Sequence, residues 1–168
     1  MSRVLPMETL IRQVTSNDID RCFEIESAAY PMDEAATREK IKIRAEQYPE
    51  GFIVLELNQK VIGFINSGCA DNVVMSDENF KELIGHSSNA PNVVIMSVVL
   101  DPEFQGLGYS VQLMNAFIKT VKELNKQTIH LMCKDQYLKL YEKFGFTYSK
   151  VSESSHGGEK WHEMLLVL

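Results

Sequence analysis

The sequence predicts an α/β fold in which a sheet is flanked by helices. Three observations favour this class. Strand-like and helix-like hydrophobic patterns alternate along the chain, a hairpin pattern occupies residues 52–65, and an apolar run at 93–100 precedes a glycine loop and a helical pattern. The 168 residues are enough for one core and show neither an internal repeat nor a linker, so we expect one domain over residues 1–168.

The first elements are predicted from caps and periodicity. A strand is expected over Thr9–Val14, and Ser16–Asp18 supplies oxygens that can cap a helix, which ends near Tyr30 because Pro31 follows. Asp33 is expected to cap a second helix that runs to about residue 48. Its modest apolar content and many charges predict a position at the surface.

A hairpin and a long loop are expected next. Phe52–Leu55 and Val61–Ile65 have strand composition and flank a polar turn at Asn58–Lys60. Residues Asp71–Asn92 mix acidic, Asn, Ser and Gly residues with one short helical candidate, Asp77–Ile84. A loop of this length inside a domain is often functional, which is how we interpret it.

The second half contains the clearest helix. Apolar side chains recur there at steps of four and three, at Leu107, Val111, Met114, Ile118 and Val121. Thr128–Cys133 is a strand candidate, Asp135 can cap a further helix, and Gly145 fits the position just past its end. The remaining expected elements are closing strands at Phe146–Val151 and Trp161–Leu168, and a mobile loop between them at Ser152–Gly158.

Composition excludes several classes of function. The net charge is −6 and the basic residues are scattered, which argues against nucleic acid or an anionic membrane as a partner. Cys22, Cys69 and Cys133 are odd in number and widely spaced, so neither a disulfide framework nor a zinc site is predicted. No leader-like or membrane-length apolar run occurs. We expect a cytoplasmic protein that requires no metal. The sequence does not indicate whether the protein is a monomer or a homodimer.

The segment from Val93 to Ser110 is the most informative part of the chain. Its apolar run stops at a Pro-containing turn, and Gly106 and Gly108 then precede the helical pattern. Glycines allow close backbone approach, and the first N–H groups of a helix lack internal partners, so such a loop can bind phosphate. Val111 stands where a dinucleotide fingerprint requires a third glycine, and the Gly-Lys-Ser/Thr of a P-loop is missing. The segment therefore predicts a phosphorylated cofactor that is bound neither by a dinucleotide fingerprint nor by a P-loop.

Gln105-x-x-Gly108-x-Ser110 resembles motif A of the GNAT superfamily of acetyl-CoA-dependent N-acetyltransferases. Two further segments, Leu131–Asp135 and Leu140–Phe146, resemble the fifth strand and fourth helix of that superfamily. The resemblance implies a mixed, mostly antiparallel central sheet of about seven strands flanked by about four helices. Within the superfamily, the chain is most similar to the arylalkylamine (serotonin) branch through Phe23–Glu26, the loop before Val93, Phe104 and Leu131–Cys133.

The resemblance also implies a set of site residues. Tyr141 matches the tyrosine that protonates the departing thiolate, and Val98 and Met132 match positions that line the acceptor site. Spacing alone favours an aromatic stripe of Tyr137, Tyr141 and Phe144 packed on the sheet, whereas the motif favours the catalytic role of Tyr141. The residues implied to bind the cofactor are Val98, Val99, Leu100, Gln105, Gly106, Leu107, Gly108, Tyr109, Ser110 and Val111.

The sequence does not identify the group that deprotonates the acceptor. The arylalkylamine branch uses a pair of histidines at positions where this chain has Val94 and Met96. Candidates elsewhere are His86, which could act directly or through water, and with less support His156 and His162. Glu24 and Glu26 could face the acceptor cleft from the first helix, but acids in such a helix are usually at the surface, and we interpret both as surface residues.

The expected function is acetyl transfer from acetyl-CoA to the primary amine of a small molecule by direct attack. A protein or peptide amino group is an alternative acceptor, which would need an open groove. The other alternative is a noncatalytic acyl-CoA-binding module, favoured by the missing histidine pair and opposed by Tyr141.

Overall fold

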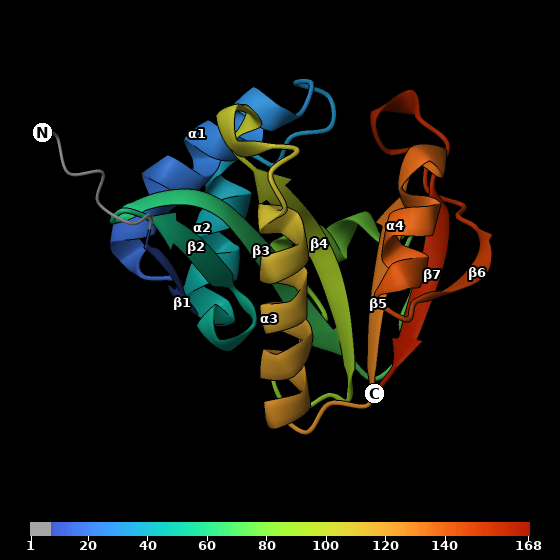
Figure 1. The fold of residues 1–168 in the computed structure, drawn as a ribbon. Coiled ribbons are helices and arrows are strands. Elements are labelled where there is room, and N and C mark those ends of the chain that lie inside the picture. Colours follow the sequence, from blue (N-terminus) through green and yellow to red (C-terminus); the bar gives the residue numbers. More distant parts are fainter. Residues whose placement is uncertain (1–7) are drawn as a thin grey trace, which may run out of the picture.

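The computed structural model describes residues 8–168, which form a seven-stranded sheet with helices on both faces (Figure 1). Its strands are β1 (Thr9–Gln13), β2 (Ile53–Leu57), β3 (Lys60–Ala70), β4 (Asn92–Leu100), β5 (Thr128–Cys133), β6 (Thr147–Val151) and β7 (His162–Val167). Its α-helices are α1 (Ile19–Ala29), α2 (Arg38–Gln47), α3 (Tyr109–Glu123) and α4 (Leu138–Lys143). The strand order is β1-β2-β3-β4-β5-β7-β6, with β4 and β5 parallel and every other pair antiparallel. The expected mixed, mostly antiparallel sheet is confirmed.

The sheet opens between β4 and β5. These strands pair only where Asn92–Val94 of β4 lie beside Thr128–His130 of β5. Beyond this point β4 remains paired with β3 alone, and β5 with β7 alone. Figure 1 shows the two strands close together at one end and apart at the other. The β3–β4 register also shifts, so that Met96 has no partner on β3. Such a bulge bends a strand, which turns the second half of β4 away from β5.

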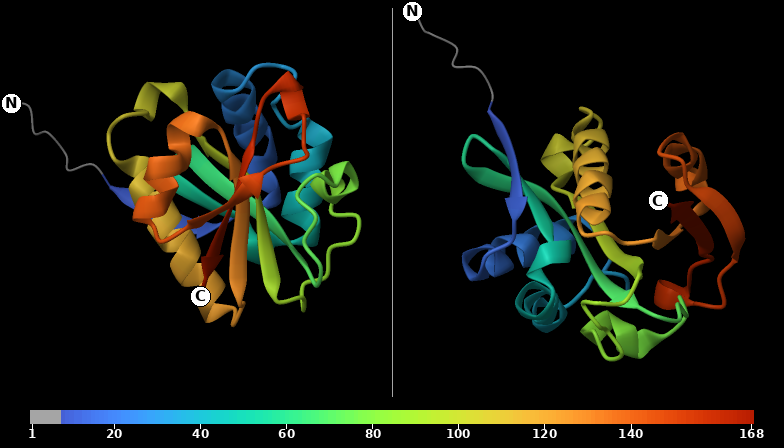
Figure 2. Two further views of the ribbon diagram at one scale, coloured as in Figure 1. Left: turned by 90° about the vertical axis from the view of Figure 1, so that its right-hand side faces the viewer. Right: turned by 90° about the horizontal axis from the view of Figure 1, so that it is seen from below.

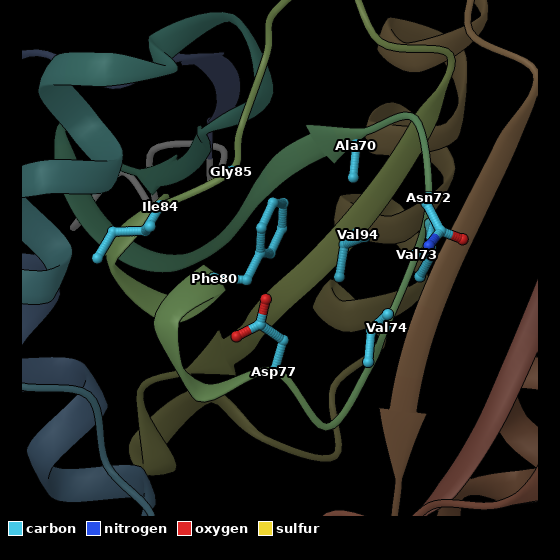
Figure 3. Close-up of a pocket in the computed structure, with 9 residues that line it drawn as sticks. All are labelled: Ala70, Asn72, Val73, Val74, Asp77, Phe80, Ile84, Gly85 and Val94. Atoms are coloured by element: carbon cyan, nitrogen blue, oxygen red, sulfur yellow. The ribbon is translucent and has the colours of Figure 1, made fainter.

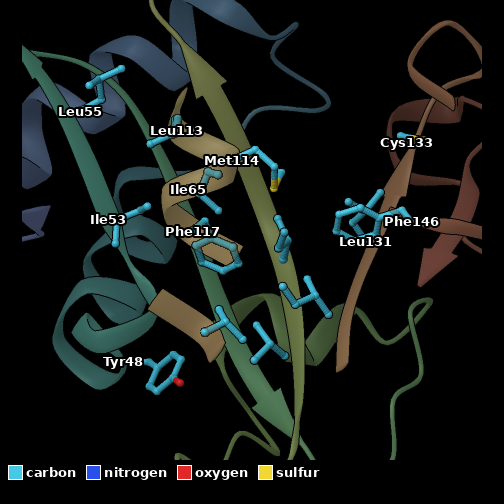
Figure 4. Packing of buried hydrophobic residues seen from close by; sticks show 14 of the residues in the cluster. Tyr48, Ile53, Leu55, Ile65, Leu113, Met114, Phe117, Leu131, Cys133 and Phe146 are labelled. Carbon is cyan, nitrogen blue, oxygen red and sulfur yellow. The ribbon is translucent and has the colours of Figure 1, made fainter. Parts of the chain in front are cut away.

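The helices cover opposite faces of the sheet. α1 and α2 lie over the face that carries Phe52, Val54 and Phe64, and α3 lies over the other (Figure 2). Neighbouring residues of β2 alternate between the two cores because successive strand side chains point to opposite faces. On the α3 side, Figure 4 shows the packing of Ile53, Leu55, Ile65, Leu113, Met114 and Phe117.

Helix α2 differs from the prediction at its start and in its burial. It begins at Arg38, and the Thr37 side chain accepts a hydrogen bond from the Lys40 N–H at 3.2 Å, so Thr37 rather than Asp33 is the N-cap. Ile41 and Arg44 are buried. The surface position predicted for this helix is therefore wrong for its inner face. The many charged side chains made the short apolar stripe on that face hard to recognise in the sequence.

Helix α3 begins later than its apolar pattern indicates. Gly108 is its N-cap with φ +88°, which leaves Leu107 outside the helix and 66% exposed. Val111 is 43% exposed as well. The buried face is instead formed by Leu113, Met114, Phe117 and Val121. The predicted stripe thus included two exposed residues at the amino-terminal end.

Turns account for the remaining differences. The short helix expected at Asp77–Ile84 is a 3-10 turn over Glu78–Glu82. Another 3-10 turn, Asp135–Tyr137, precedes α4, and Asp135 contacts His162 instead of capping the helix. β3 runs to Ala70, five residues beyond its predicted end, because the strand stays paired with β4.

Two predicted turns are confirmed. Asn58 and Gln59 adopt φ of +49° and +71° in the β2–β3 hairpin, and Gly145 has φ +100° just beyond α4. A left-handed backbone is what these positions require. In the described part of the chain, the three cysteines are free and buried. No helix there has both the length and the apolar character needed to cross a membrane.

Candidate active site

A cavity of about 540 Å³ occupies the opening between β4 and β5. One wall is the second half of β4, from Val94 to Leu100, and the opposite wall is the end of β5 with α4. The end of α1 and the loop after it supply a third side. Because a splayed sheet exposes strand backbone that pairing would otherwise cover, the cavity gives a ligand access to β4.

The cavity brings together eight of the residues that the sequence singled out. They are Val98, Val99, Leu100, Gln105, Gly106, Ser110, Met132 and Tyr141. Val94 and Met96, at the positions of the histidine pair in the arylalkylamine branch, line it as well. Four predicted cofactor residues, Leu107, Gly108, Tyr109 and Val111, belong to the adjoining loop and first turn of α3 and do not line the cavity.

The glycine loop leaves its backbone accessible. Gly106 and Gly108 have φ of +76° and +88°, and a Cβ atom at either position would meet no atom within 4 Å. No side chain caps α3. Gln105 Nε2 donates to the Leu100 carbonyl at 3.2 Å, which ties the loop to the end of β4. A loop of this shape at the start of a 15-residue helix can bind an anion through backbone N–H groups.

Tyr141 projects from α4 into the same cavity. Its ring meets Phe146 edge to face at 5.9 Å, and among residues 8–168 its hydroxyl has no hydrogen-bond partner. Burial, followed by the nearby Cys133 and Tyr137, raises the pKa of Tyr141, which keeps the phenol protonated at neutral pH. The side chain therefore packs against the core, as an aromatic stripe would, and also presents a proton donor to the cavity.

Two ionisable residues that were interpreted as surface residues from the sequence are buried and line the cavity. Glu26 and Arg44 are each 2% exposed. Arg44 Nε donates to the Lys81 carbonyl at 3.1 Å, and its Nη1 approaches Ser97 Oγ at 3.4 Å. Burial lowers the pKa of Arg44 to about 10, although the Glu26 charge opposes the shift. A signal was present for Glu26, because it follows Cys22 by one helical turn and so shares the apolar face of α1.

Three polar contacts close one side of the cavity and are called the bridge below. Lys134 Nζ pairs with Glu34 Oε1 at 2.7 Å, His156 Nε2 meets the Glu34 carbonyl at 2.8 Å, and Lys81 Nζ meets His156 Nδ1 at 2.8 Å. Since an ammonium only donates, His156 Nδ1 accepts and Nε2–H donates to Glu34. The bridge anchors the β6–β7 loop, so the mobility predicted for Ser152–Gly158 is not what its contacts indicate.

The other predicted polar candidates lie outside the cavity. His86 Nδ1 accepts the Cys69 N–H at 2.8 Å, and burial lowers the pKa of His86. His162 contacts Asp135 and Tyr148. Glu24 is exposed and pairs with Arg21, which agrees with its interpretation as a surface acid. Of the three histidines considered as bases, His156 alone lines the cavity.

A smaller cavity of about 110 Å³ adjoins the large one (Figure 3). The loop between β3 and β4, interpreted above as functional, supplies most of its wall. Val74, Asp77, Phe80 and Val94 line both cavities. These residues therefore form the wall between the two cavities.

Comparisons with known proteins point to one family. Residues 16–146 match the family model described as the acetyltransferase (GNAT) family. An uncharacterized N-acetyltransferase of Porphyra purpurea is 28% identical over 100 residues, which cover 57% of this chain and 58% of that relative's length. The chain thus spans less than two thirds of this relative.

Solved structures share the fold. The loading GNATL domain of CurA from Lyngbya majuscula superposes with a TM-score of 0.84 at 15% identity, over 95% of this chain and 98% of that one. The GphF GNAT-like decarboxylase, in complex with isobutyryl-CoA, gives a TM-score of 0.78 at 13% identity, over 94% and 98% of the two chains. At such identities the likeness concerns the fold alone. None of these three proteins is described as acting on an arylalkylamine.

Proposed function

This chain belongs to the acetyltransferase (GNAT) family, and from that premise we propose that it transfers an acetyl group from acetyl-CoA to the primary amine of a small molecule by direct attack. One observation carries the proposal. A single cavity is lined by Gly106 of the glycine loop, by Tyr141 and by buried polar groups such as Glu26 and Arg44. Both partners of a direct transfer could therefore meet beside β4.

The cofactor end is proposed to lie over the glycine loop. Gly106 and Gly108 fit close approach by a diphosphate because a Cβ there would project into open space. Backbone N–H groups from Gly106 to Val111 would then bind the diphosphate oxygens. The pantetheine arm and acyl group would lie against Val98, Val99 and Leu100. Acetyl-CoA supplies the activated acyl group as a thioester, and no metal is needed for this chemistry.

The residues around the thioester have distinct proposed roles. An alkylamine has a pKa of about 10.4 and must lose a proton before it attacks. Attack places negative charge on the thioester oxygen, and a backbone N–H of the splayed part of β4 would stabilise that charge, by roughly 3 to 4 kcal/mol in comparable acyl transfers. Tyr141 would then protonate the departing sulfur, because its raised pKa keeps the proton available.

The acceptor is proposed to be a small molecule. The bridge joins the α1–α2 side of the cavity to the β5–β7 side by contacts of 2.7 to 2.8 Å among Glu34, Lys81, Lys134 and His156. A closed wall of this kind suits a compact amine better than an extended polypeptide, which needs a continuous open groove. Met132 lines the same region and is proposed to contact the acceptor. An aromatic acceptor, as in the arylalkylamine branch, is one member of this class.

Thiol release from acetyl-CoA tests the proposal. The purified chain is mixed with acetyl-CoA and with aryl amines, polyamines, amino acids or peptides in turn, and free thiol is measured against time. We expect release that depends on a small primary amine. Peptide-dependent release would favour the protein acceptor instead. Calorimetric binding of acetyl-CoA without acceptor-dependent release would favour a noncatalytic module.

A further inference from the structure

Glu26 lines the cavity and has a carboxylate oxygen to which no described residue donates a hydrogen bond. The residue lies in the last turn of α1 and is 2% exposed. Its Oε1 atom is buried and has no hydrogen-bond partner among residues 8–168. Leaving a buried acceptor without a donor costs free energy, so such an atom in a folded protein calls for a partner, whether an ordered water, an ion or a ligand that uses it.

The surroundings of Glu26 act on the pKa of its carboxyl group in opposite directions. Burial is the largest, and it raises the pKa of the Glu26 carboxyl. Hydrogen bonds from the Ser97 hydroxyl and the Ala36 N–H, together with the Arg44 charge, act in the other direction. The titratable groups that face Glu26 are Cys22 and Tyr30 of the α1 segment, Arg44 of α2 and His156 of the β6–β7 loop. Burial therefore raises the pKa of the Glu26 carboxyl above its ordinary value, while these contacts oppose the rise and favour the ionised form.

The position of Glu26 connects it to the strand where the transfer is proposed to occur. Ser97 belongs to β4, and the next residue, Val98, lines the cavity where the acyl group is proposed to lie. Tyr30, at the end of α1, donates its hydroxyl to the Val98 carbonyl at 2.8 Å. The end of α1 is thereby fixed against the splayed part of β4.

Glu34 is the competing carboxylate, because its Oε2 atom is also buried without a partner. Its other oxygen pairs with Lys134 Nζ at 2.7 Å, so an adjacent ammonium already compensates its charge. Glu26 forms no direct ion pair among the described residues, and Arg44 acts on it through a longer-range attraction. Glu26 is therefore the better partner for an incoming cation.

We propose that Glu26 binds the ammonium group of the acceptor and removes its proton, so that the amine nitrogen can attack the thioester. This assignment rests on the proposed function. One N–H bond breaks and its proton moves to Glu26 Oε1, a C–N bond forms at the thioester carbon, and the C–S bond breaks. Tyr141 gives its proton to the sulfur and regains one from the nitrogen. Glu26 then releases the first proton to solvent, which is the one proton that the overall reaction liberates.

The pH dependence of kcat/KM tests the assignment with Glu26→Gln, which keeps the side-chain volume. In the parent protein, kcat/KM should reach a plateau between the pKa of Glu26 and that of the amine. In Glu26→Gln, kcat/KM at pH 7 should fall about 100-fold and then rise about tenfold per pH unit, because the variant must wait for free amine. Acetyl-CoA affinity, measured by calorimetry, should stay unchanged.

Two further variants make the result decisive. Glu26→Ala should regain activity in the presence of formate, which restores a carboxylate but not a structural contact. Glu24→Gln on the exposed side of α1 should keep the parent pH profile. An active parent protein together with an unchanged pH profile in Glu26→Gln, or with no formate rescue of a folded Glu26→Ala, overturns the assignment while leaving the proposed function intact. Absence of amine-dependent release from the parent protein overturns the proposed function itself.

Discussion

At the residue scale, the Tyr141 hydroxyl is a proton donor that has no partner among the described residues, on a ring that is held by packing. The ring meets Phe146 edge to face, and the phenol keeps its proton because burial raises its pKa. We expect Tyr141→Phe to lower kcat about 100-fold, since general acid catalysis contributes about that much. Calorimetry should show the same acetyl-CoA affinity as in the parent protein, because the ring and its packing remain.

Tyr148→Phe is the matched control for the loss of a phenol. Its hydroxyl bonds His162 Nδ1 at 3.1 Å, and the residue does not line the cavity. Turnover should therefore be retained in Tyr148→Phe. If Tyr141→Phe also retained turnover, Tyr141 would have a packing role alone.

Residue-scale prediction depends on whether a side chain carries a local signature. Tyr141 and Met132 were identified because both lie within segments that resemble the family, and both line the cavity. Glu26 and Arg44 escaped prediction because charged residues are usually solvated, and their burial depends on β4 contacts that come from a distant part of the chain. Periodicity could have placed Glu26 on an apolar face, but not beside Ser97.

At the element scale, the loop before α3 relies on glycine for its backbone shape. Gly106→Ala should be strained at φ +76°, at a cost of about 1–2 kcal/mol. Its methyl group would also project into the open space where the diphosphate is proposed to bind. We expect Tm to fall by about 2–8 °C and acetyl-CoA affinity to fall about tenfold. Scanning calorimetry and titration calorimetry measure the two effects separately.

Gly158→Ala separates backbone strain from ligand binding. Gly158 has φ +71° and equally open surroundings, but it lies in the β6–β7 loop and does not line the cavity. The control should lose similar stability and keep its acetyl-CoA affinity. Equal loss of affinity in both variants would mean that strain, not blocked access, explains the effect.

Element boundaries were predicted less well than element types, for a local physical reason. The apolar spacing correctly indicated α3, but a left-handed Gly108 starts the helix after Leu107. Similarly, Thr37 caps α2 although Asp33 offered a carboxylate earlier, because the Thr37 oxygen is the one that reaches the Lys40 N–H. Competing caps in one segment are resolved by backbone geometry, which composition does not encode.

At the scale of the whole molecule, the site depends on an interrupted strand pair. The mixed, mostly antiparallel character of the sheet followed from the pattern and the family resemblance, but the strand order and the short β4–β5 ladder did not. The bridge was equally beyond prediction, because it joins Glu34, Lys81, Lys134 and His156 from four separate segments. Long-range polar contacts of this kind leave no periodic trace in a sequence.

The bridge leads to a prediction about acceptor size. The double variant Glu34→Gln with Lys134→Gln removes the 2.7 Å ion pair across the opening without leaving either charge buried alone. Loosening this wall should allow bulkier amines to enter. We expect kcat/KM for branched or multi-ring amines to rise relative to that for the smallest active amine, with acetyl-CoA affinity unchanged, as measured by thiol release and calorimetry.

Amide hydrogen exchange connects this change in specificity to its structural cause. Exchange in residues 152–161 should speed up in the double variant, since the Lys134 ammonium that lies over the Trp161 ring at 5.7 Å is lost, and the ion pair no longer holds the segment whose Glu34 carbonyl contacts His156. Lys160→Gln removes an exposed charge from the same loop and should change neither exchange nor acceptor range. If exchange accelerates while acceptor range stays the same, the bridge stabilises the fold but does not limit the acceptor. Selectivity would then have to come from the residues between the two cavities, Phe80 foremost.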